Sequence, residues 1–334
     1  MVWLVKFVPL VILIEKNLLK LKKLNMKILG IGNAIIDVIC KVEENFLTKN
    51  NLTKGTMKLI FDYKEFKNIL TKLKIEKTVS GGSVANSIVG LSQLKNEVGF
   101  IGKISDDDFG AKYEEGLKKE NVEYFYSKKK ESLPTGSCLI LVTPDSERTM
   151  CTFLGIAGKI GEIDVNEKLI EKSDLIFLEG YLWDEGEPKK AFEKAIKYSN
   201  KTAMSLSDLF CVERHKKNFL ILVKEKLDLT FANENEIMSL IDAKNFNEVV
   251  SFAKWIKKHI IITRGEKGAI SIIGDKIIET KAKKNLTIRD LTGAGDLFAA
   301  GYLHGFINNL SREKCLEEGV ELSSKVIQQI GARL

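Results

Sequence analysis

The feature that most limits the folds open to this chain is a regular alternation of short apolar runs with segments of helical hydrophobic spacing, which begins at Met26. The apolar runs predict strands at 27–32, 37–43, 56–61, 77–80, 97–102, 122–126, 137–143, 148–154, 174–179, 202–206, 228–232, 259–263, 269–273 and 276–281. The helical spacing predicts helices at 62–74, 83–95, 106–120, 187–199, 212–225, 234–241, 246–257, 295–308 and 312–330. Such an alternation over 334 residues favours the α/β class, with a largely parallel sheet covered by helices on both faces.

Two stretches depart from this alternation. Residues 37–61 and 122–154 are rich in predicted strand and poor in predicted helix. They predict a small separate sheet made from two excursions out of the main domain. This sheet could form a lid over the carboxyl ends of the parallel strands, where open α/β sheets bind ligands. Because the sequence shows no repeat, low-complexity tract or linker rich in Pro and Gly, we expect one domain over residues 26–334 that carries this lid.

The first 25 residues do not fit the pattern. Residues 1–14 are mostly apolar, but Lys6 and Pro9 interrupt the run, which is too short for a membrane-spanning helix. A signal peptide is not indicated either, since the run lacks a small-residue cleavage site and the lysines come after it. Met26 opens a clean strand. We therefore expect Met26 to be the true start and residues 1–25 to be an N-terminal extension that need not belong to the native protein.

The charge and the cysteines argue against several classes of protein. Residues 1–25 carry +4 of the formal net charge of +7, and no Lys/Arg stripe with interleaved aromatic residues occurs, so no nucleic-acid partner is expected. The five cysteines are scattered and form no CxxC pair. They indicate neither a disulfide framework nor a zinc site, and a reducing cytoplasmic location fits them best. We expect a monomer or homodimer without a membrane partner.

Residues 289–301 combine a glycine turn with the start of an apolar helix. Gly293, Ala294 and Gly295 stand in the turn, and glycines allow an anion to approach the unpaired N–H groups of a helix start. Asp296 would repel an anion in a site that only binds phosphate. It fits a site in which its carboxylate takes a proton from a hydroxyl group that then attacks the phosphate. The alternative is that the glycines only make a turn and that Asp296 only caps the helix.

The end of the first predicted strand carries two polar residues, Asn33 and Asp37. Gly30 and Gly32 resemble the start of a dinucleotide fingerprint, but position 35 is Ile instead of the third glycine, so a nicotinamide-dependent enzyme is not favoured. Asp37 stands between apolar residues and needs partners, which two sugar hydroxyl groups would supply. We predict that Asn33 and Asp37 bind substrate. The alternative is a structural aspartate that holds a turn.

A second glycine turn, Gly81-Gly82-Ser83, opens the helix predicted from residue 83. The backbone of the two glycines can lie close to a ligand, and Asn86, one turn into the helix, offers the donors and acceptors that suit a polyol. We predict that these residues bind substrate, although an ordinary capped helix start has the same pattern. Arg148 joins this set because, from the predicted lid, it could reach a transferring phosphoryl group.

A bound nucleotide would need a device other than a P-loop. The Gly-Lys pairs at 102–103 and 158–159 are each followed by Ile and lack the leading glycine. Thr263, Gly265 and Gly268 link two predicted strands and could pass close to phosphates or adenine. The same residues could also form a plain hairpin.

Asn233 and Glu236 follow the predicted strand at 228–232. They are three residues apart, so at a helix start they can face the same way. Amide and carboxylate oxygens suit Mg²⁺, usually through its bound waters. We predict Asn233 in the ATP site and Glu236 as a water-mediated Mg²⁺ ligand. The alternative is a capping box, in which the two side chains only close the helix start.

Four of these segments together resemble the signatures of one family, the ribokinase-like (PfkB) sugar and nucleoside kinases. DLTGAGD at 290–296 resembles the family's DTxGAGD, GGSVAN at 81–86 its GGxxxN, NENE at 233–236 its NxxE, and TRGEKG at 263–268 its TxGxxG. The resemblance extends over nearly the whole chain from Met26. Within the family, GIGNAIID at 30–37 looks more like adenosine kinases and their bacterial relatives than like ribokinase proper.

The resemblance implies an α/β, ribokinase-like fold, in which a central mostly parallel sheet flanked by helices carries a small β-sheet lid. It implies transfer of the γ-phosphate of ATP, with Mg²⁺, to a primary hydroxyl group. Asp296 would be the base, and the N–H groups of Gly293, Ala294 and Gly295 would form an anion hole. The other implied roles are binding of sugar hydroxyls by Asp37, Gly82, Ser83 and Asn86, organisation of Mg²⁺ by Asn233 and Glu236, and an ATP site at Thr263, Gly265 and Gly268.

One departure from the family concerns a monovalent cation. Many members use a cation such as K⁺ near the anion hole, and Asp290 is the residue that would bind it here. The family's usual Thr after this aspartate is Leu291 in this chain, which removes a hydroxyl group beside the cation site. The requirement for K⁺ is therefore open, whereas the base and the N–H groups are unaffected.

The leading hypothesis is a kinase that converts adenosine and ATP to AMP and ADP. A ribose- or fructose-type sugar kinase is the alternative in the same class, and a non-catalytic ligand-binding protein on the same fold is a third. A pure binder has no use for a base at Asp296, which argues against the third. Phe153, Tyr181 and Trp183 could give a purine a stacking face, but aromatic residues at strand ends also pack in cores.

Overall fold

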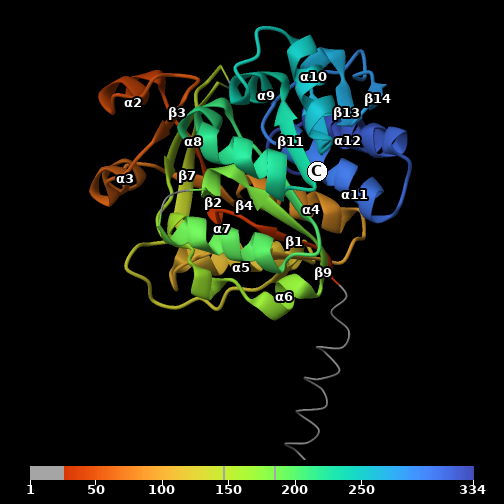
Figure 1. Ribbon diagram of the computed structural model, residues 1–334. Coiled ribbons are helices and arrows are strands. Elements are labelled where there is room, and N and C mark those ends of the chain that lie inside the picture. Colours follow the sequence, from red (N-terminus) through yellow and green to blue (C-terminus); the bar gives the residue numbers. More distant parts are fainter. Residues whose placement is uncertain (1–25, 146, 184–185) are drawn as a thin grey trace, which may run out of the picture.

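The chain contains two β-sheets, one of nine strands and one of five (Figure 1). The structure is a computed structural model that describes residues 26–145, 147–183 and 186–334, and the extension expected at 1–25 lies outside these residues. Within the described ranges, no helix combines the length and the apolar composition that crossing a lipid bilayer requires.

The large sheet has the strand order β14-β13-β12-β11-β10-β9-β1-β5-β6. Its strands are β1 (Met26–Ile31), β5 (Val98–Ile101), β6 (Glu123–Tyr124), β9 (Ser173–Glu179), β10 (Thr202–Ser205), β11 (Leu229–Asn233), β12 (His259–Thr263), β13 (Ala269–Ile273) and β14 (Lys276–Thr280). Neighbours from β6 to β12 are parallel, and β13 and β14 are added antiparallel at one edge. The chain proceeds from β1 to one side and from β9 to the other. The carboxyl ends of these two strands therefore flank a topological switch point, where open α/β sheets bind ligands.

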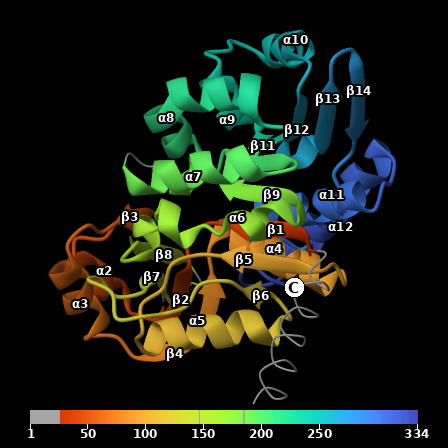
Figure 2. The ribbon, with the colours of Figure 1, turned by 60° about the horizontal axis from the view of Figure 1, so that its bottom comes forward.

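The small sheet has the order β3-β8-β7-β2-β4. Its strands are β2 (Ile35–Lys41), β3 (Met57–Leu59), β4 (Ile75–Gly81), β7 (Gly136–Val142) and β8 (Arg148–Phe153). Figures 1 and 2 show this sheet on one side of the molecule together with α2 (Glu44–Lys49) and α3 (Tyr63–Leu70). The expected separate small sheet is confirmed. It follows β1 directly, so its first strand starts at the switch point.

The composition of the small sheet differs from the prediction in three details. The strand expected at 122–126 is β6, which pairs with β5 at the edge of the large sheet. Strand β4, beyond the expected range, belongs to the small sheet through its pairing with β2. Helix α2 lies within 37–61, where little helix was expected, and its single buried residue, Leu47, leaves almost no periodic signal. Sheet membership depends on pairing between distant segments, which a local pattern does not contain.

Helices cover both faces of the large sheet, as predicted. One face packs against α4 (Ser83–Gln93), α5 (Asp108–Lys119), α11 (Ala294–Ile307) and α12 (Arg312–Val326). The other packs against α6 (Glu167–Glu171), α7 (Glu187–Tyr198), α8 (Leu209–Ile221), α9 (Glu234–Leu240) and α10 (Phe246–Ile256). Helix α6 was not predicted because it spans five residues, too few for a periodic pattern. The small sheet has a hydrophobic core of its own, closed by α2 and α3.

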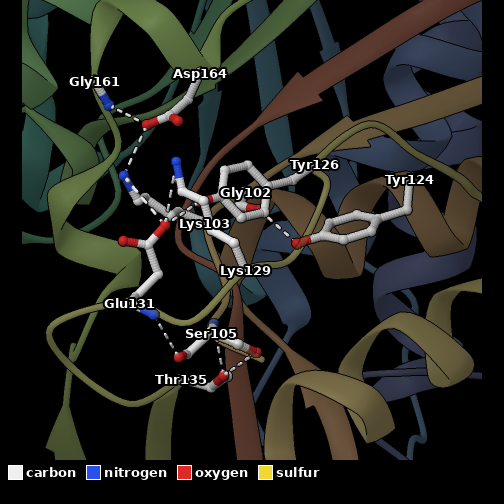
Figure 3. Close-up of polar contacts among 10 residues, drawn as sticks. All are labelled: Gly102, Lys103, Ser105, Tyr124, Tyr126, Lys129, Glu131, Thr135, Gly161 and Asp164. Carbon is white, nitrogen blue, oxygen red and sulfur yellow. Dashed lines mark hydrogen bonds and ion pairs between the residues drawn. The ribbon is translucent and has the colours of Figure 1, made fainter. Parts of the chain in front are cut away.

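A buried ion cluster joins the end of β5 to two irregular segments (Figure 3). Lys103, which follows β5, has its Nζ 3.1 Å from Asp164 Oδ2 and 3.9 Å from Glu131 Oε1. Tyr126 donates its hydroxyl to Glu131 Oε1 at 2.6 Å, and the backbone N–H of Gly161 donates to Asp164 Oδ2 at 2.8 Å. Only 10% of the Lys103 side chain and 5% of the Asp164 side chain are exposed. The lysine of this Gly-Lys pair thus has a structural role.

Replacing Lys103 with Met is expected to lower the free energy of unfolding by about 3 kcal/mol, because the change leaves the buried Asp164 carboxylate without its cation. Glu131 keeps Lys129, whose Nζ lies 3.7 Å from Glu131 Oε1. The control is Lys27→Met, which removes a pair with Asp174 whose side chains are 41% and 51% exposed. An exposed pair of this kind is worth about 1 kcal/mol or less. Urea unfolding measures both variants. Equal losses for the two would show that the buried cluster contributes no more than a surface pair.

Candidate active site

Helix α11 begins at the predicted glycine turn. Gly293 is its N-cap with φ of +80°, a left-handed conformation that glycine adopts without strain, and Ala294 is the first helical residue. Asp296 lies in the first turn, and the seven residues that follow it are all buried. The burial of the helix body anchors the aspartate at a fixed place.

The carboxylate of Asp296 accepts hydrogen bonds from the start of α4. Ser83 Oγ donates to Oδ1 at 2.6 Å, and Asn86 Nδ2 donates to Oδ2 at 3.0 Å. Ser87 Oγ also donates to the Asp296 backbone carbonyl at 2.9 Å. Burial raises the pKa of Asp296 to about 6, while the bonds from Ser83 and Asn86 and the charge of Arg333 act in the opposite direction. At neutral pH the group is therefore an ionised carboxylate that can accept a proton.

The three residues expected to form an anion hole differ in access. No atom of the described residues lies within 4 Å of the place where a Cβ on Gly295 would stand, so a ligand can approach this glycine. The N–H of Ala294 donates to the Leu291 carbonyl at 3.2 Å. A Cβ on Gly293 would lie 2.6 Å from the Cα of Ala332, so the chain's last segment packs against this turn. Gly295 thus offers the open side of the helix start.

Asn33 and Asp37 lie beside the switch point with unused acceptor atoms. Asn33 is buried, and its Oδ1 has no hydrogen-bond partner in the described part of the chain. Asp37 stands against Gly81, where a Cβ would lie 2.6 Å from the Asp37 Oδ2. Burial raises the pKa of Asp37 to about 7, against the charges of Arg333 and Arg148, and no described residue donates a hydrogen bond to this carboxylate. Both side chains can accept hydrogen bonds from hydroxyl groups of a ligand.

Gly82 allows the two loops of the site to meet. It is the N-cap of α4 with φ of +101°, and a Cβ here would lie 2.3 Å from the carbonyl oxygen of Asn33. A glycine is required because any side chain would force the loops apart. This close approach brings the polyol-binding residues expected on α4, Ser83 and Asn86, next to both Asn33 and Asp296.

Glu179 is a residue of this site that the sequence analysis missed. It ends β9, is buried, and accepts three hydrogen bonds: from Asn33 Nδ2 at 2.9 Å, from the Asn33 N–H at 3.4 Å, and from the Val84 N–H at 3.1 Å. Burial raises the pKa of Glu179 to about 7, although the donors on Val84 and Asn33 favour its ionised form. The only signal in the sequence is a single carboxylate at the end of an apolar strand.

The residues predicted to contact ATP meet at the carboxyl ends of two neighbouring strands. Asn233 ends β11 and is paired in register with Thr263, which ends β12. Gly265 has φ of +58° and open space where a Cβ would stand, as far as the described residues go. Gly268 is different, since a Cβ there would collide with the carbonyl of Thr280. Gly265 therefore presents open backbone to a ligand, and Gly268 permits the close packing of β14.

Asn233 and Glu236 form the capping box that was the alternative to a metal site. The Asn233 side chain accepts from the Glu236 N–H at 2.8 Å, while Glu236 Oε2 accepts from the Asn233 N–H at 2.9 Å. Glu236 Oε1 also accepts from Asn233 Nδ2 at 2.6 Å. Burial raises the pKa of Glu236 to about 7. No cluster of three or more metal-ligating side chains occurs in the described ranges. Remaining lone pairs on Glu236 suit the waters of Mg²⁺ better than direct coordination.

Asp290 and Arg148 pair with each other. Arg148 Nη1, at the start of β8 in the small sheet, lies 2.5 Å from Asp290 Oδ2, and both side chains are largely buried. Asp290 also accepts from the N–H and Oγ1 of Thr292 and from the N–H of Gly331. Burial alone would raise the pKa of Asp290, but these hydrogen bonds and the Arg148 charge hold it below its ordinary value. Both oxygens of the Asp290 carboxylate are thus engaged by described residues, and its role toward K⁺ stays a prediction.

The aromatic residues considered for a stacking face have other partners. Phe153 is buried in the core of the small sheet against Phe66 and Tyr63. Trp183 is buried against Phe192 and Phe219 in the core of the large sheet. Phe153 and Trp183 thus present no free ring face for a purine among the described residues. Tyr181, the third of these residues, is half-buried and donates its hydroxyl to Asp208 Oδ2 at 3.0 Å.

Comparisons with known proteins show the family and the fold of the chain. The model of the pfkB family carbohydrate kinases matches residues 27–334. A solved structure of adenosine kinase from Sinorhizobium meliloti superposes with a TM-score of 0.84 at 32% identity, covering 93% of this chain and 96% of that one. A probable sugar kinase from Rhizobium etli gives a TM-score of 0.83 at 33% identity, covering 92% and 95%. Adenosine kinase 2 of Arabidopsis thaliana is 27% identical over 91% of this chain and 94% of its own length.

Proposed function

Because the chain belongs to the pfkB family of carbohydrate kinases, whose members transfer a phosphoryl group to an alcohol, we propose that it phosphorylates the primary hydroxyl of adenosine with ATP. The products are AMP and ADP. The observation that carries the proposal is the placement of Asp296, a half-buried carboxylate held by Ser83 and Asn86 at the start of α11. It lies among the residues that are suited to hold hydroxyl groups.

The proposed reaction follows from this placement. Asn33 and Asp37 accept hydrogen bonds from the sugar hydroxyls, which fixes the primary hydroxyl near Asp296. The Asp296 carboxylate takes the proton of that hydroxyl as its oxygen attacks the γ-phosphorus. The new O–P bond forms while the bond between the γ-phosphorus and the β,γ-bridging oxygen breaks, and ADP leaves. The backbone N–H of Gly295, on the open side of the helix start, would stabilise the negative charge that develops on the transferred group.

Mg²⁺ would accompany ATP and neutralise part of the phosphate charge. The residues that would hold it are Asn233 and Glu236, through bound waters. Asp208, the N-cap of α8, adds a second carboxylate near Glu236, and its charge contributes to the raised pKa of Glu236. Asn233 and Glu236 can hold these waters without breaking the hydrogen bonds of their capping box.

Adenosine is favoured over a free sugar because two of the three similar proteins reported above are adenosine kinases. A sugar kinase is the second candidate. Asn33 and Asp37 would bind the hydroxyls of any furanose, and the Rhizobium etli relative is named as a probable sugar kinase.

ATP consumption in the presence of Mg²⁺, with and without K⁺, tests the proposal over adenosine, other nucleosides, ribose, fructose and ketodeoxy sugars. We expect adenosine to give the highest kcat/KM. A larger value for a free sugar would favour the sugar kinase. If no compound in the panel supported turnover, the protein would be better described as a ligand-binding member of the fold.

A further inference from the structure

The last residues of the chain form part of the site described above. After α12 the chain turns back, and the Gly331 N–H donates to Asp290 Oδ2 at 2.7 Å. Ala332 packs on the N-cap glycine of α11, and Gln93 of α4 donates to the Leu334 carbonyl at 3.2 Å. Figure 1 shows this end of the chain beside α4 and α11. Residues 331–334 therefore touch both helices that build the surroundings of Asp296.

Arg333 connects this segment to the base. Its Nε donates to Asn86 Oδ1 at 3.1 Å, and the amide of Asn86 donates in turn to Asp296 Oδ2. Its Nη2 is buried and has no hydrogen-bond partner in the described ranges. Leaving such a donor unpaired costs about 1–3 kcal/mol, and more when it is charged. A ligand oxygen that accepts from Nη2 would remove this cost.

The charge of the guanidinium matches a site crowded with acids. Glu179 is buried and Asp37 and Asp296 are half-buried here, and the titratable groups that face Arg333 are Tyr113, Asp37, Glu120 and Asp296. A bound γ-phosphate adds further negative charge. Arg148, the arginine expected from the sequence to meet that phosphate, already pairs with Asp290. Arg333 is thus the better placed of the two guanidinium groups to receive it.

We propose that Arg333 is a catalytic residue whose Nη2 donates a hydrogen bond to the phosphoryl group in transfer. This rests on the proposed kinase function. The acceptor oxygen bonds to the γ-phosphorus, the bond from phosphorus to the ADP oxygen breaks, and the hydroxyl proton goes to Asp296. Arg333 stays protonated and stabilises the charge on the non-bridging oxygens.

The test compares Arg333→Ala, Arg333→Lys and the control Lys325→Ala, which removes an exposed cation on α12, with the wild type on the best acceptor of the panel. We expect Arg333→Ala to lower kcat by about 10²-fold to 10³-fold, the range for loss of a charged donor to the transition state. The KM for the acceptor should change little. Arg333→Lys, which keeps the charge but not the planar fork, should lie in between. Guanidinium ion at non-denaturing concentration should restore part of the activity of Arg333→Ala.

The pH dependence of kcat/KM is a second test of the role of Arg333. Removing the Arg333 charge raises the pKa of Asp296, since that charge favours the ionised carboxylate. The acidic limb of kcat/KM should therefore move to higher pH in Arg333→Ala, and stay in place in Lys325→Ala. A limb that does not move would show that the guanidinium exerts no charge effect on the base.

The outcomes separate the two proposals. No turnover by the wild type with any acceptor would reject the kinase function and the role of Arg333 with it. An active wild type with an equally active Arg333→Ala would reject the role of Arg333 alone. If Arg333→Ala raised the acceptor KM and left kcat unchanged, Arg333 would be an acceptor-binding residue. If Arg333→Ala raised kcat, residues 331–334 would slow the reaction in the wild type. Each of these results overturns the proposed contact with the phosphoryl group. If guanidinium ion restores activity to an inactive Arg333→Ala, that variant is folded and lacks only the guanidinium group.

Discussion

Replacing Asp296 with Asn is expected to lower kcat by about 10³-fold to 10⁴-fold, at the upper end of the range for a general base. The amide is nearly isosteric and can still accept a hydrogen bond from Ser83, but it cannot take the hydroxyl proton. ATP and the acceptor should bind with nearly unchanged affinity, because neither Asn33 nor Asp37 is altered. Steady-state kinetics together with calorimetric titration of the acceptor separate the two effects.

The control for this variant is Asp275→Asn. Asp275 lies exposed in the turn between β13 and β14, so the same loss of a carboxylate there should leave kcat unchanged. Turnover by the Asp296 variant within a few-fold of the wild type would remove the base from the proposed mechanism. The glycine turn would then be a structural helix start, which was the alternative reading of the sequence.

Replacing Glu179 with Ala should have the largest effect on the architecture of the site. The change leaves three donors, on Asn33 and Val84, without their acceptor, and each buried donor left unpaired costs about 1–3 kcal/mol. We expect the free energy of unfolding to fall by about 3 kcal/mol or more, and the acceptor KM to rise because Asn33 loses its anchor. Urea unfolding and acceptor kinetics measure the two quantities.

The matched control is Glu193→Ala, on the exposed side of the neighbouring helix α7. This variant should change the free energy of unfolding by no more than about 0.5 kcal/mol. If Glu179→Ala changed the free energy of unfolding as little as Glu193→Ala, the three hydrogen bonds to this carboxylate would contribute nothing measurable to stability. A loss of stability with unchanged acceptor KM would show that it supports the fold without positioning the substrate.

Local periodicity predicted most of the fold because each strand and helix carries its own pattern. The runs that become β1, β9 and β11 are mostly apolar and almost wholly buried, as is usual for strands between two layers of helix. Sheet membership could not be predicted in this way. The partners of β4 and β6, which are β2 and β5, are chosen by packing between distant segments.

Residues of the candidate site were predictable from the sequence where a glycine turn precedes them. Gly82 and Gly293 mark loops that approach other backbone closely, and the residues after them, Ser83 and Asp296, meet in space. Glu179 and Arg333 were not predicted, although Gly180 and Gly331 stand close to them in sequence. Their roles come from burial beside the switch point and from the return of the last segment, neither of which has a local signature. Arg148 and Asp290 were assigned to different ligands, whereas the structure pairs them across the two sheets.

The order of the contacts along the chain has a consequence for biosynthesis. Asp296 is held by Ser83 and Asn86, 213 and 210 residues earlier, and Asn86 is held by Arg333, 247 residues later. A ribosome adds about 5–20 residues per second and releases the N-terminal parts first. The acceptor-binding half of the site thus leaves the ribosome without a base, and the base arrives before its arginine. Under the proposed mechanism, a nascent chain that lacks Asp296 and Arg333 would lack both the base and the donor to the phosphoryl group.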